Sequence, residues 1–272
     1  MFWYNGGLVE ANRLELAIDE PGLLYGATLF TTLRVYHQSL ESPLTNWRGH
    51  CDRLFSSLQA FGWQLPDTGR LRDGAQALSA FYPVVRITIF PNGREWITGR
   101  FLPPDLAQRQ QLGVTAWLAD APEYRRSLPA HKTGNYLSAW LAQQASRQLG
   151  ATEAILVDAN GNWLETSTGN LWGWKDGSWW TPPLTAGLLP GVVRSQLIVW
   201  LKAQGWAIQE MPWDSKLVQE FEAIAYTNSV VELIPIHTVL QENTTLTYDP
   251  FHSTLEQLRS LFCSVYHKDT SN

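Results

Sequence analysis

Apolar and polar residues follow one another in short regular blocks along this chain of 272 residues. Blocks in which apolar residues alternate with others predict β-strands, and blocks in which they recur every three to four positions predict α-helices. The predicted strands cover residues 1–6, 29–36, 84–90, 96–102, 114–118, 153–157, 163–165, 170–174, 179–181, 223–227 and 233–239. The predicted helices cover residues 46–61, 71–81, 134–149 and 190–203, with one more short helix after Asp249. This mixture predicts an α+β fold.

Turn signals and one polar stretch divide the predicted elements. Asn160-Gly161 and Asp176-Gly177 are typical of tight hairpins, so the strands between residues 153 and 181 should form an antiparallel meander. The polar residues 108–111 are the best candidate for a linker. They predict a small N-terminal α+β domain over residues 1–108 and a larger domain over residues 113–272.

Two predicted elements in the N-terminal part mix polar with apolar residues. In helix 46–61 the apolar stripe includes His50, and Arg53 lies next to it. A hydrogen-bonded buried histidine and a solvated arginine would explain these residues without any chemistry. Strand 29–36 also suits the wall of a binding cleft. It should place Leu29, Thr31, Leu33 and Val35 on one face and Phe30, Thr32, Arg34 and Tyr36 on the other.

Composition and charge narrow the class of protein. Hydrophobic residues make up 44% and charged residues 17% of the chain, which excludes a disordered chain or a coiled coil. The formal net charge of −5, without long basic runs, argues against nucleic acid and anionic membranes as partners. Cys51 and Cys263 form neither a metal-ligand spacing nor a disulfide framework, so we expect no metal site. Neither a signal sequence nor a membrane-spanning run is recognisable, and we expect a cytoplasmic protein.

Lys132 lies where an irregular segment turns into the predicted helix 134–149. A lysine at such a junction can point into a cleft, where the loss of water lowers the pKa of its amine, as a Schiff-base lysine requires. A lysine at the start of a helix is more often a solvated surface residue. Lys132 alone therefore decides nothing.

Three further features supply what a pyridoxal phosphate enzyme needs. Glu165 leaves a hairpin strand, and a carboxylate can keep the pyridine nitrogen of that cofactor protonated. Pro190-Gly191 opens a helix whose first turn contains no acid, so its backbone N–H groups can bind a phosphate. Ser229 offers a hydroxyl in a turn. Together with Lys132, these features predict a site for pyridoxal 5'-phosphate.

Five motifs occur in one order along the chain. They are His-Cys-Asp-Arg-Leu at 50–54, Lys132 with Asn135, Glu-x-x-x-x-Asn from Glu165 to Asn170, residues 187–194 and residues 228–235. With them the sequence resembles the fold type IV, or class IV aminotransferase-like, family of pyridoxal phosphate enzymes, from the N-terminal strand to about Val239. The resemblance implies a two-domain mixed α/β fold, with a small N-terminal α+β domain. The larger domain would contain a pseudo-barrel of mostly antiparallel strands, and the active site would lie in the cleft.

The resemblance also implies roles for single residues. Lys132 would form the Schiff base with the cofactor and act as catalytic acid and base, with Glu165 at the pyridine nitrogen. Arg53 would provide the cation for the phosphate. The remaining cofactor-binding residues would be Asn170, Leu189 against one ring face, Val192 and Val193 through their backbone N–H groups, and Ser229 through its hydroxyl. Family members commonly have threonine in place of Val193, so that side-chain contact is missing here.

Within this family, the strand Leu29–Val35 is similar to the Phe-Thr-Thr-x-Arg-Val run of 4-amino-4-deoxychorismate lyases. The implied function is conversion of 4-amino-4-deoxychorismate to 4-aminobenzoate and pyruvate for folate biosynthesis, with Thr31 as a second catalytic residue. Phe30, Thr31 and Arg94 would bind the substrate. Arg94 would replace an arginine of the lyases, because this chain has Ile-Phe-Pro at 89–91 where they have Ser/Thr-Arg-Gly.

Two alternatives stay open beside the lyase. One is an aminotransferase of D-amino or branched-chain amino acids with the same Lys132. The other is a non-catalytic relative, which is disfavoured because Lys132, Glu165 and Arg53 are costly to keep together without a ligand. The family resemblance further implies a homodimer that acts on a small-molecule substrate.

Overall fold

The computed structural model describes residues 1–264. Contacts between Cα atoms group them into two compact units. The N-terminal unit contains Met1–Pro103 and His131–Tyr136, and the C-terminal unit contains Pro104–Ala130 and the described residues from Leu137 onward. The segment with Lys132 therefore packs with the N-terminal unit, although the C-terminal unit flanks it in the sequence.

The polar stretch 108–111 is helical, so the prediction that it is a linker is wrong. It belongs to α4 (Leu106–Leu112), which lies inside the C-terminal unit and packs on β13 (Glu232–Leu240). Arg109 forms an ion pair with Asp105 at 2.7 Å, and the Gln110 side chain donates a hydrogen bond to the carbonyl of Val231 at 2.9 Å. Polar contacts of this kind give a short helix the composition of a linker.

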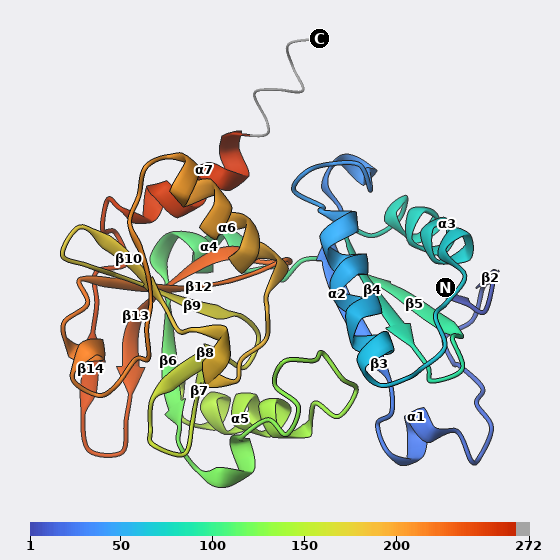
Figure 1. The fold of residues 1–272 in the computed structure, drawn as a ribbon, viewed down its shortest axis with the longest axis horizontal. Coiled ribbons are helices and arrows are strands. Elements are labelled where there is room, and N and C mark those ends of the chain that lie inside the picture. Colours follow the sequence, from blue (N-terminus) through green and yellow to red (C-terminus); the bar gives the residue numbers. More distant parts are fainter. Residues whose placement is uncertain (265–272) are drawn as a thin grey trace. The chain divides into compact units, whose positions relative to one another are not determined.

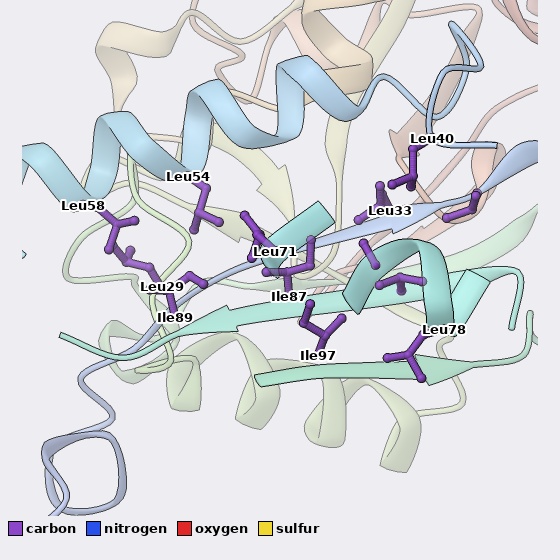
Figure 2. Close-up of a cluster of buried hydrophobic side chains, with 13 residues drawn as sticks. Leu29, Leu33, Leu40, Leu54, Leu58, Leu71, Leu78, Ile87, Ile89 and Ile97 are labelled. Atoms are coloured by element: carbon purple, nitrogen blue, oxygen red, sulfur yellow. The ribbon is translucent and has the colours of Figure 1, made fainter. Parts of the chain in front are cut away.

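The N-terminal unit is an antiparallel sheet with helices packed on it (Figure 1). The strand order is β2-β1-β5-β4-β3. The strands are β1 (Phe2–Tyr4), β2 (Gly7–Val9), β3 (Leu29–Arg34), β4 (Val84–Ile89) and β5 (Glu95–Arg100). The helices are α1 (Pro21–Leu24), α2 (Trp47–Ala60) and α3 (Thr68–Ser79), with a 3-10 turn at Tyr36–Gln38. A core of 13 buried hydrophobic residues joins this sheet to α2 and α3 (Figure 2).

The predicted alternation along β3 is confirmed. Leu29 and Leu33 belong to the buried core, and Thr31 between them is only 1% exposed. Phe30 and Thr32 point to the opposite face, because successive side chains of a strand alternate. On that face Thr32 lies opposite Arg86 of β4.

Side-chain caps fix where the two main helices of this unit begin. The Asn46 side chain accepts a hydrogen bond from the backbone N–H of Gly49 at the start of α2. The Asp67 side chain accepts one from Arg70 at the start of α3. Such caps satisfy N–H groups that have no acceptor within the helix. The Asp67 cap explains why α3 begins three residues before the predicted helix 71–81.

The C-terminal unit contains a closed barrel of six strands, as the family resemblance implies. Strands β9, β12, β13, β6, β7 and β8 pair in that order, and β8 pairs back to β9. Only β13–β6 and β6–β7 are parallel within this ring. The meander predicted between residues 153 and 181 is confirmed. The ring strands besides β13 are β6 (Val114–Ala119), β7 (Glu153–Val157), β8 (Trp163–Thr166), β9 (Asn170–Lys175) and β12 (Ala223–Asn228).

Further elements extend and cover this barrel (Figure 1). Strands β10 (Ser178–Thr181) and β11 (Ile208–Glu210) continue the sheet from β9, and β14 (Thr245–Thr247) pairs with β13. Helix α5 (Leu137–Gln148) packs on β6 and β7, α6 (Val192–Ala203) on β12, and α7 (Leu255–Ser264) on β13. Three 3-10 turns lie at Pro122–Tyr124, Leu184–Ala186 and Leu217–Gln219. Strands β2, β11 and β14, each of three residues, were not predicted.

The described residues contain no helix that is both long and apolar enough to cross a membrane. The same part of the chain contains no group of three or more His, Cys, Asp or Glu side chains arranged to hold a metal ion.

From the core of the N-terminal unit we expect two leucine-to-alanine substitutions to lower the free energy of unfolding by different amounts. Leu71 in α3 is fully buried, whereas Leu65 is 47% exposed. Leu71→Ala should lower the free energy of unfolding by about 2–5 kcal/mol, because it leaves a cavity in the core. Leu65→Ala, the control, should change it by less than about 0.5 kcal/mol. Urea unfolding measures both, and equal midpoints for the two variants would contradict this core.

Candidate active site

Lys132 is held in extended backbone beside β3. The backbone N–H of Phe30 donates to the carbonyl of Lys132 at 2.8 Å, and the N–H of Gly134 donates to the carbonyl of Thr28 at 2.6 Å. Leu29 and Thr133 form an antiparallel bridge between these contacts. The helix predicted from residue 134 begins three residues later, because α5 starts only at Leu137. Backbone pairing, not a helix end, positions this lysine.

The Lys132 amine lies against two aromatic rings. Its Nζ is 4.9 Å from the ring centre of Phe30 and 5.1 Å from that of Tyr136. The two rings contact each other edge to face, with their centres 5.7 Å apart. Lys132 is also the first lysine of the sequence, since residues 1–131 contain none. The N-terminal unit thus offers a single lysine, and it is half-buried.

Thr31 joins Arg53 to His50 in the same unit. Arg53 can only donate, and its Nη2 lies 3.0 Å from Thr31 Oγ1. Thr31 therefore accepts from Arg53, and its hydroxyl also forms a hydrogen bond with His50 Nδ1, which is 2.6 Å away. Burial, followed by the charges of Arg53 and Lys132, holds the pKa of His50 well below its usual value.

Arg86 is a site residue that sequence reasoning missed. Its guanidinium lies 3.7 Å from the ring centre of Phe30, on the ring that Lys132 also contacts. Among the described residues it has no ion-pair partner, and burial, followed by the charge of Arg100, lowers its pKa from the ordinary value. A single arginine inside the apolar strand 84–89 was the available signal. The group around Lys132 thus contains a second cation that can meet an anionic ligand.

Arg94, predicted to bind substrate, is engaged elsewhere. Its Nη2 forms an ion pair with the buried carboxylate of Glu20, and its Nη1 donates to the Tyr4 hydroxyl at 2.7 Å. Its guanidinium also lies beside the rings of Tyr4 and Phe90. These contacts tie a loop to the sheet, and none of them involves Phe30, Thr31 or Lys132.

Glu165 is a buried carboxylate of the C-terminal unit, with 5% exposure. Arg126 Nη1 lies 2.6 Å from its Oε1, and the backbone N–H of Leu189 donates to its Oε2 at 3.2 Å. A cavity of about 190 Å³ is lined by Glu165, Arg126, Asp158 and Gly187, among others. Arg126 was not predicted, because nothing in the sequence links it to a residue 39 positions away. It gives the buried carboxylate of Glu165 an ion-pair partner.

Glu165 and Asn170 form the pair that closes the barrel between β8 and β9. Both also hold Leu189: Glu165 accepts from its N–H, and Asn170 donates to its carbonyl at 2.9 Å. Gly191 follows closely, and a Cβ on it would come within 1.9 Å of Asn170 Oδ1. The Glu-x-x-x-x-Asn motif therefore fixes the approach to helix α6, and a side chain in place of Gly191 would displace the Asn170 amide.

The start of α6 has the features of an anion site. Gly191 is its N-cap and makes no side-chain cap hydrogen bond, and the first turn contains no acid. Val192 and Val193 are buried, and their backbone N–H groups precede the first acceptors within the helix. Ser229 is half-buried in the turn between β12 and β13. In that turn the Asn228 side chain accepts from the N–H groups of Val230 and Val231 at 2.9 and 3.0 Å.

A family model for amino-transferase class IV matches residues 28–239. The chain belongs to the class IV aminotransferase family. Branched-chain-amino-acid aminotransferase of Escherichia coli K12 is 25% identical over 268 residues, which cover 87% of this chain and 84% of that enzyme. Aminodeoxychorismate lyase of Vibrio harveyi is 21% identical over 252 residues, which cover 87% of this chain and 90% of that enzyme.

Solved structures share the fold. An Escherichia coli branched-chain amino acid aminotransferase has a TM-score of 0.80 at 23% identity, covering 96% of this chain and 93% of that one. A hypothetical aminotransferase from Mycobacterium tuberculosis in its PLP-bound form has a TM-score of 0.81 at 19% identity, covering 96% and 98%. The predicted fold is confirmed. Enzymes of this family depend on pyridoxal 5'-phosphate, which is therefore the cofactor of this chain.

The hydrogen bonds of Thr31 predict a loss of stability without its hydroxyl. Thr31→Val keeps the shape of the side chain but leaves Arg53 and His50 without this buried partner. The free energy of unfolding should fall by about 1–3 kcal/mol. Thr31→Ser keeps the hydroxyl, and should lose only about 1 kcal/mol for the missing methyl group. Urea unfolding of both variants tests this, and a Thr31→Val protein as stable as the wild type would refute the network.

Proposed function

We propose that this chain is a 4-amino-4-deoxychorismate lyase, which converts its substrate to 4-aminobenzoate and pyruvate. The observation that carries the proposal is the position of Lys132 directly beside the Phe-Thr-Thr strand, paired with it through Phe30 and Thr28. That strand is the one that resembles the lyases. Likeness to the Vibrio harveyi lyase along 87% of this chain supports the same function.

We assign the cofactor contacts as the family resemblance implies. Lys132 Nζ would hold the aldehyde carbon, and Glu165 the pyridine nitrogen. The phosphate would meet the backbone N–H groups of Val192 and Val193, the Ser229 hydroxyl and the Arg53 guanidinium. Asn170 and Leu189 would complete the set. The donor set fits this cofactor: one half-buried lysine amine, one buried carboxylate paired with Arg126, and an acid-free helix start preceded by a glycine.

The proposed reaction is an elimination in which Lys132 moves the proton. When bound, pyridoxal phosphate supplies an electron-withdrawing ring joined to the substrate nitrogen. Lys132 Nζ takes the proton from the ring carbon that bears this nitrogen, and the bond from the neighbouring carbon to the enolpyruvyl oxygen breaks. The C–H electron pair becomes the new ring double bond, so the product is aromatic. The enolpyruvate leaves with the electrons of the broken bond, receives the proton from Lys132 and becomes pyruvate.

We assign the substrate contacts to the Phe30 face of β3. Phe30 and Arg86 lie on the Lys132 side of this strand, and an arginine there suits the carboxylates of the substrate. Thr31 lies on the other face, so we propose that it acts as a positioning residue through Arg53. Arg94 is left out of the substrate site, because Glu20 and Tyr4 already bind it.

One observation favours a second function. The Escherichia coli branched-chain-amino-acid aminotransferase is 25% identical to this chain, against 21% for the lyase. An aminotransferase would use the same Lys132 and the same cofactor contacts, but it would act on other substrates and transfer the amino group to a keto acid. A homodimeric assembly and a cytoplasmic location stay predictions for either function.

Release of 4-aminobenzoate separates these two functions. The purified protein, loaded with pyridoxal phosphate, receives enzymatically generated 4-amino-4-deoxychorismate and no keto acid. We expect 4-aminobenzoate and pyruvate in equal amounts. Lys132→Ala should slow the reaction at least about 100-fold, the scale of a lost acid–base group. Lys202→Ala, which removes an exposed lysine of α6, is the control and should not slow it.

Two results would overturn the lyase. The first is that no 4-aminobenzoate is released, although the absorbance of the protein shows that the cofactor is bound. The second is transfer of the amino group of leucine or D-alanine to 2-oxoglutarate under the same conditions without lyase turnover. That outcome would establish the aminotransferase on the same site.

A further inference from the structure

Glu153 is a buried carboxylate that the proposed reaction does not use. It lies at the start of β7 and is only 2% exposed. The Ser167 hydroxyl donates to its Oε1, the Thr168 hydroxyl donates to its Oε2 at 2.5 Å, and the Ala154 N–H donates to Oε1 at 3.1 Å. Both oxygens are thus occupied by donors from a single turn and from the neighbouring residue.

Burying the Glu153 carboxylate costs free energy that a role in packing alone would not explain. Burial raises the pKa of Glu153, and the hydrogen bonds from Ser167, Thr168 and Ala154, with the more distant charge of Arg109, only partly offset this effect. No cation forms an ion pair with Glu153 among the described residues. An apolar residue would fill this place at lower cost. The carboxylate does, however, fix the direction of two hydroxyl groups, because each has only one proton to donate.

The turn that Glu153 holds connects two residues of the proposed cofactor site. Residues 166–169 follow Glu165 directly and lead into Asn170. The turn is closed by the N–H of Thr166 donating to the carbonyl of Gly169 at 2.7 Å. Gly169 lies so close to β12 that a Cβ would come within 2.4 Å of the Thr227 carbonyl oxygen. The turn is therefore packed against the strand that ends at Asn228.

Hydrogen bonds continue from this turn to the turn of Ser229. The Asn228 side chain donates to Thr168 Oγ1, with 3.5 Å between the atoms. The same side chain accepts from the N–H groups of Val230 and Val231, which fold the chain around Ser229. Glu153 orients Thr168, Thr168 orients Asn228, and Asn228 shapes the turn. The buried carboxylate of Glu153 is thus connected through hydrogen bonds to both turns, 166–169 and the turn of Ser229.

We propose that Glu153 is a positioning residue for the phosphate end of the cofactor site. It acts through Ser167, Thr168 and Asn228 on the turn that presents Ser229. This inference rests on the cofactor contacts of the proposed function, but it does not depend on which reaction the enzyme catalyses. It requires that loss of the carboxylate weakens binding of the phosphate group and leaves binding of the aldehyde and the ring unchanged.

Glu153→Gln tests this requirement, because the amide nitrogen cannot accept the hydrogen bond that one hydroxyl now donates. The dissociation constants of pyridoxal 5'-phosphate and of pyridoxal, which lacks the phosphate, are measured on protein freed of cofactor. We expect the affinity for pyridoxal phosphate to fall about tenfold, the scale of one well-placed hydrogen bond, with the affinity for pyridoxal unchanged. The preference for the phosphorylated form therefore falls about tenfold as well.

A matched control separates positioning from general damage. Glu95→Gln alters another fully buried carboxylate, which contacts Trp3 and Arg70 in the N-terminal unit, and it should keep the wild-type preference. Thr168→Val breaks the link between Glu153 and Asn228, so it should lower the preference like Glu153→Gln. If the Glu153→Gln protein does not fold, the Thr168→Val protein provides the test of the proposal. Because both changes interrupt one path, the double variant should lose little more than either single variant.

A Glu153→Gln protein with the wild-type preference would overturn the proposal, as would equal losses for both ligands. If the wild-type protein binds pyridoxal as tightly as pyridoxal phosphate, the phosphate contacts of the proposed function fail instead. A negative lyase assay alone would leave this inference unchanged.

Discussion

Backbone pairing between β3 and the segment His131–Tyr136 is the interaction on which the position of Lys132 depends. Two hydrogen bonds join Phe30 to Lys132 and Gly134 to Thr28, so the only lysine of this unit is carried by a sheet edge. The alternation of side chains along β3 then decides which residues lie on the same side of the strand as Lys132. Phe30 and Arg86 lie on its side, and Thr31 turns toward His50 and Arg53. Any shift of this pairing by one residue would exchange the two sets.

In the C-terminal unit, a buried carboxylate lies where the barrel closes. Glu165 forms an ion pair with Arg126, and it also pairs with Asn170 at the closure of the barrel. Glu165 and Asn170 both hold the backbone of Leu189 just before α6. The same two residues therefore close the barrel and position the acid-free start of α6. Glu153 is a second buried carboxylate of this unit, with hydroxyl groups as partners in place of a cation.

The local pattern of apolar and polar residues predicted most of the fold. It did not predict side-chain contacts between residues that are far apart in the sequence. Strand alternation placed Leu29 and Leu33 in the core, and the hairpin dipeptides predicted the meander, because both signals lie within a few residues. Arg126 and Glu153 were missed, since their roles come from contacts 39 and 14 residues away. Lys132 was singled out by its motif, but its pairing with β3 was not predicted and the following helix was placed three residues too early, because such pairing leaves no pattern in its own segment. Arg94 was favoured by its place in the sequence, which does not reveal the ion pair with Glu20.

The central claim is that Lys132 is the amine that binds the cofactor, and it can be measured directly. The sequence contains lysine only at positions 132, 175, 202, 216 and 268, so the candidates separate well on a peptide map. Borohydride reduction of the protein loaded with pyridoxal phosphate, followed by proteolysis and mass spectrometry, identifies the lysine that carries the cofactor. The account predicts one stoichiometric label, on the peptide that contains Lys132. A stoichiometric label on any other lysine, with Lys132 unmodified, would contradict it.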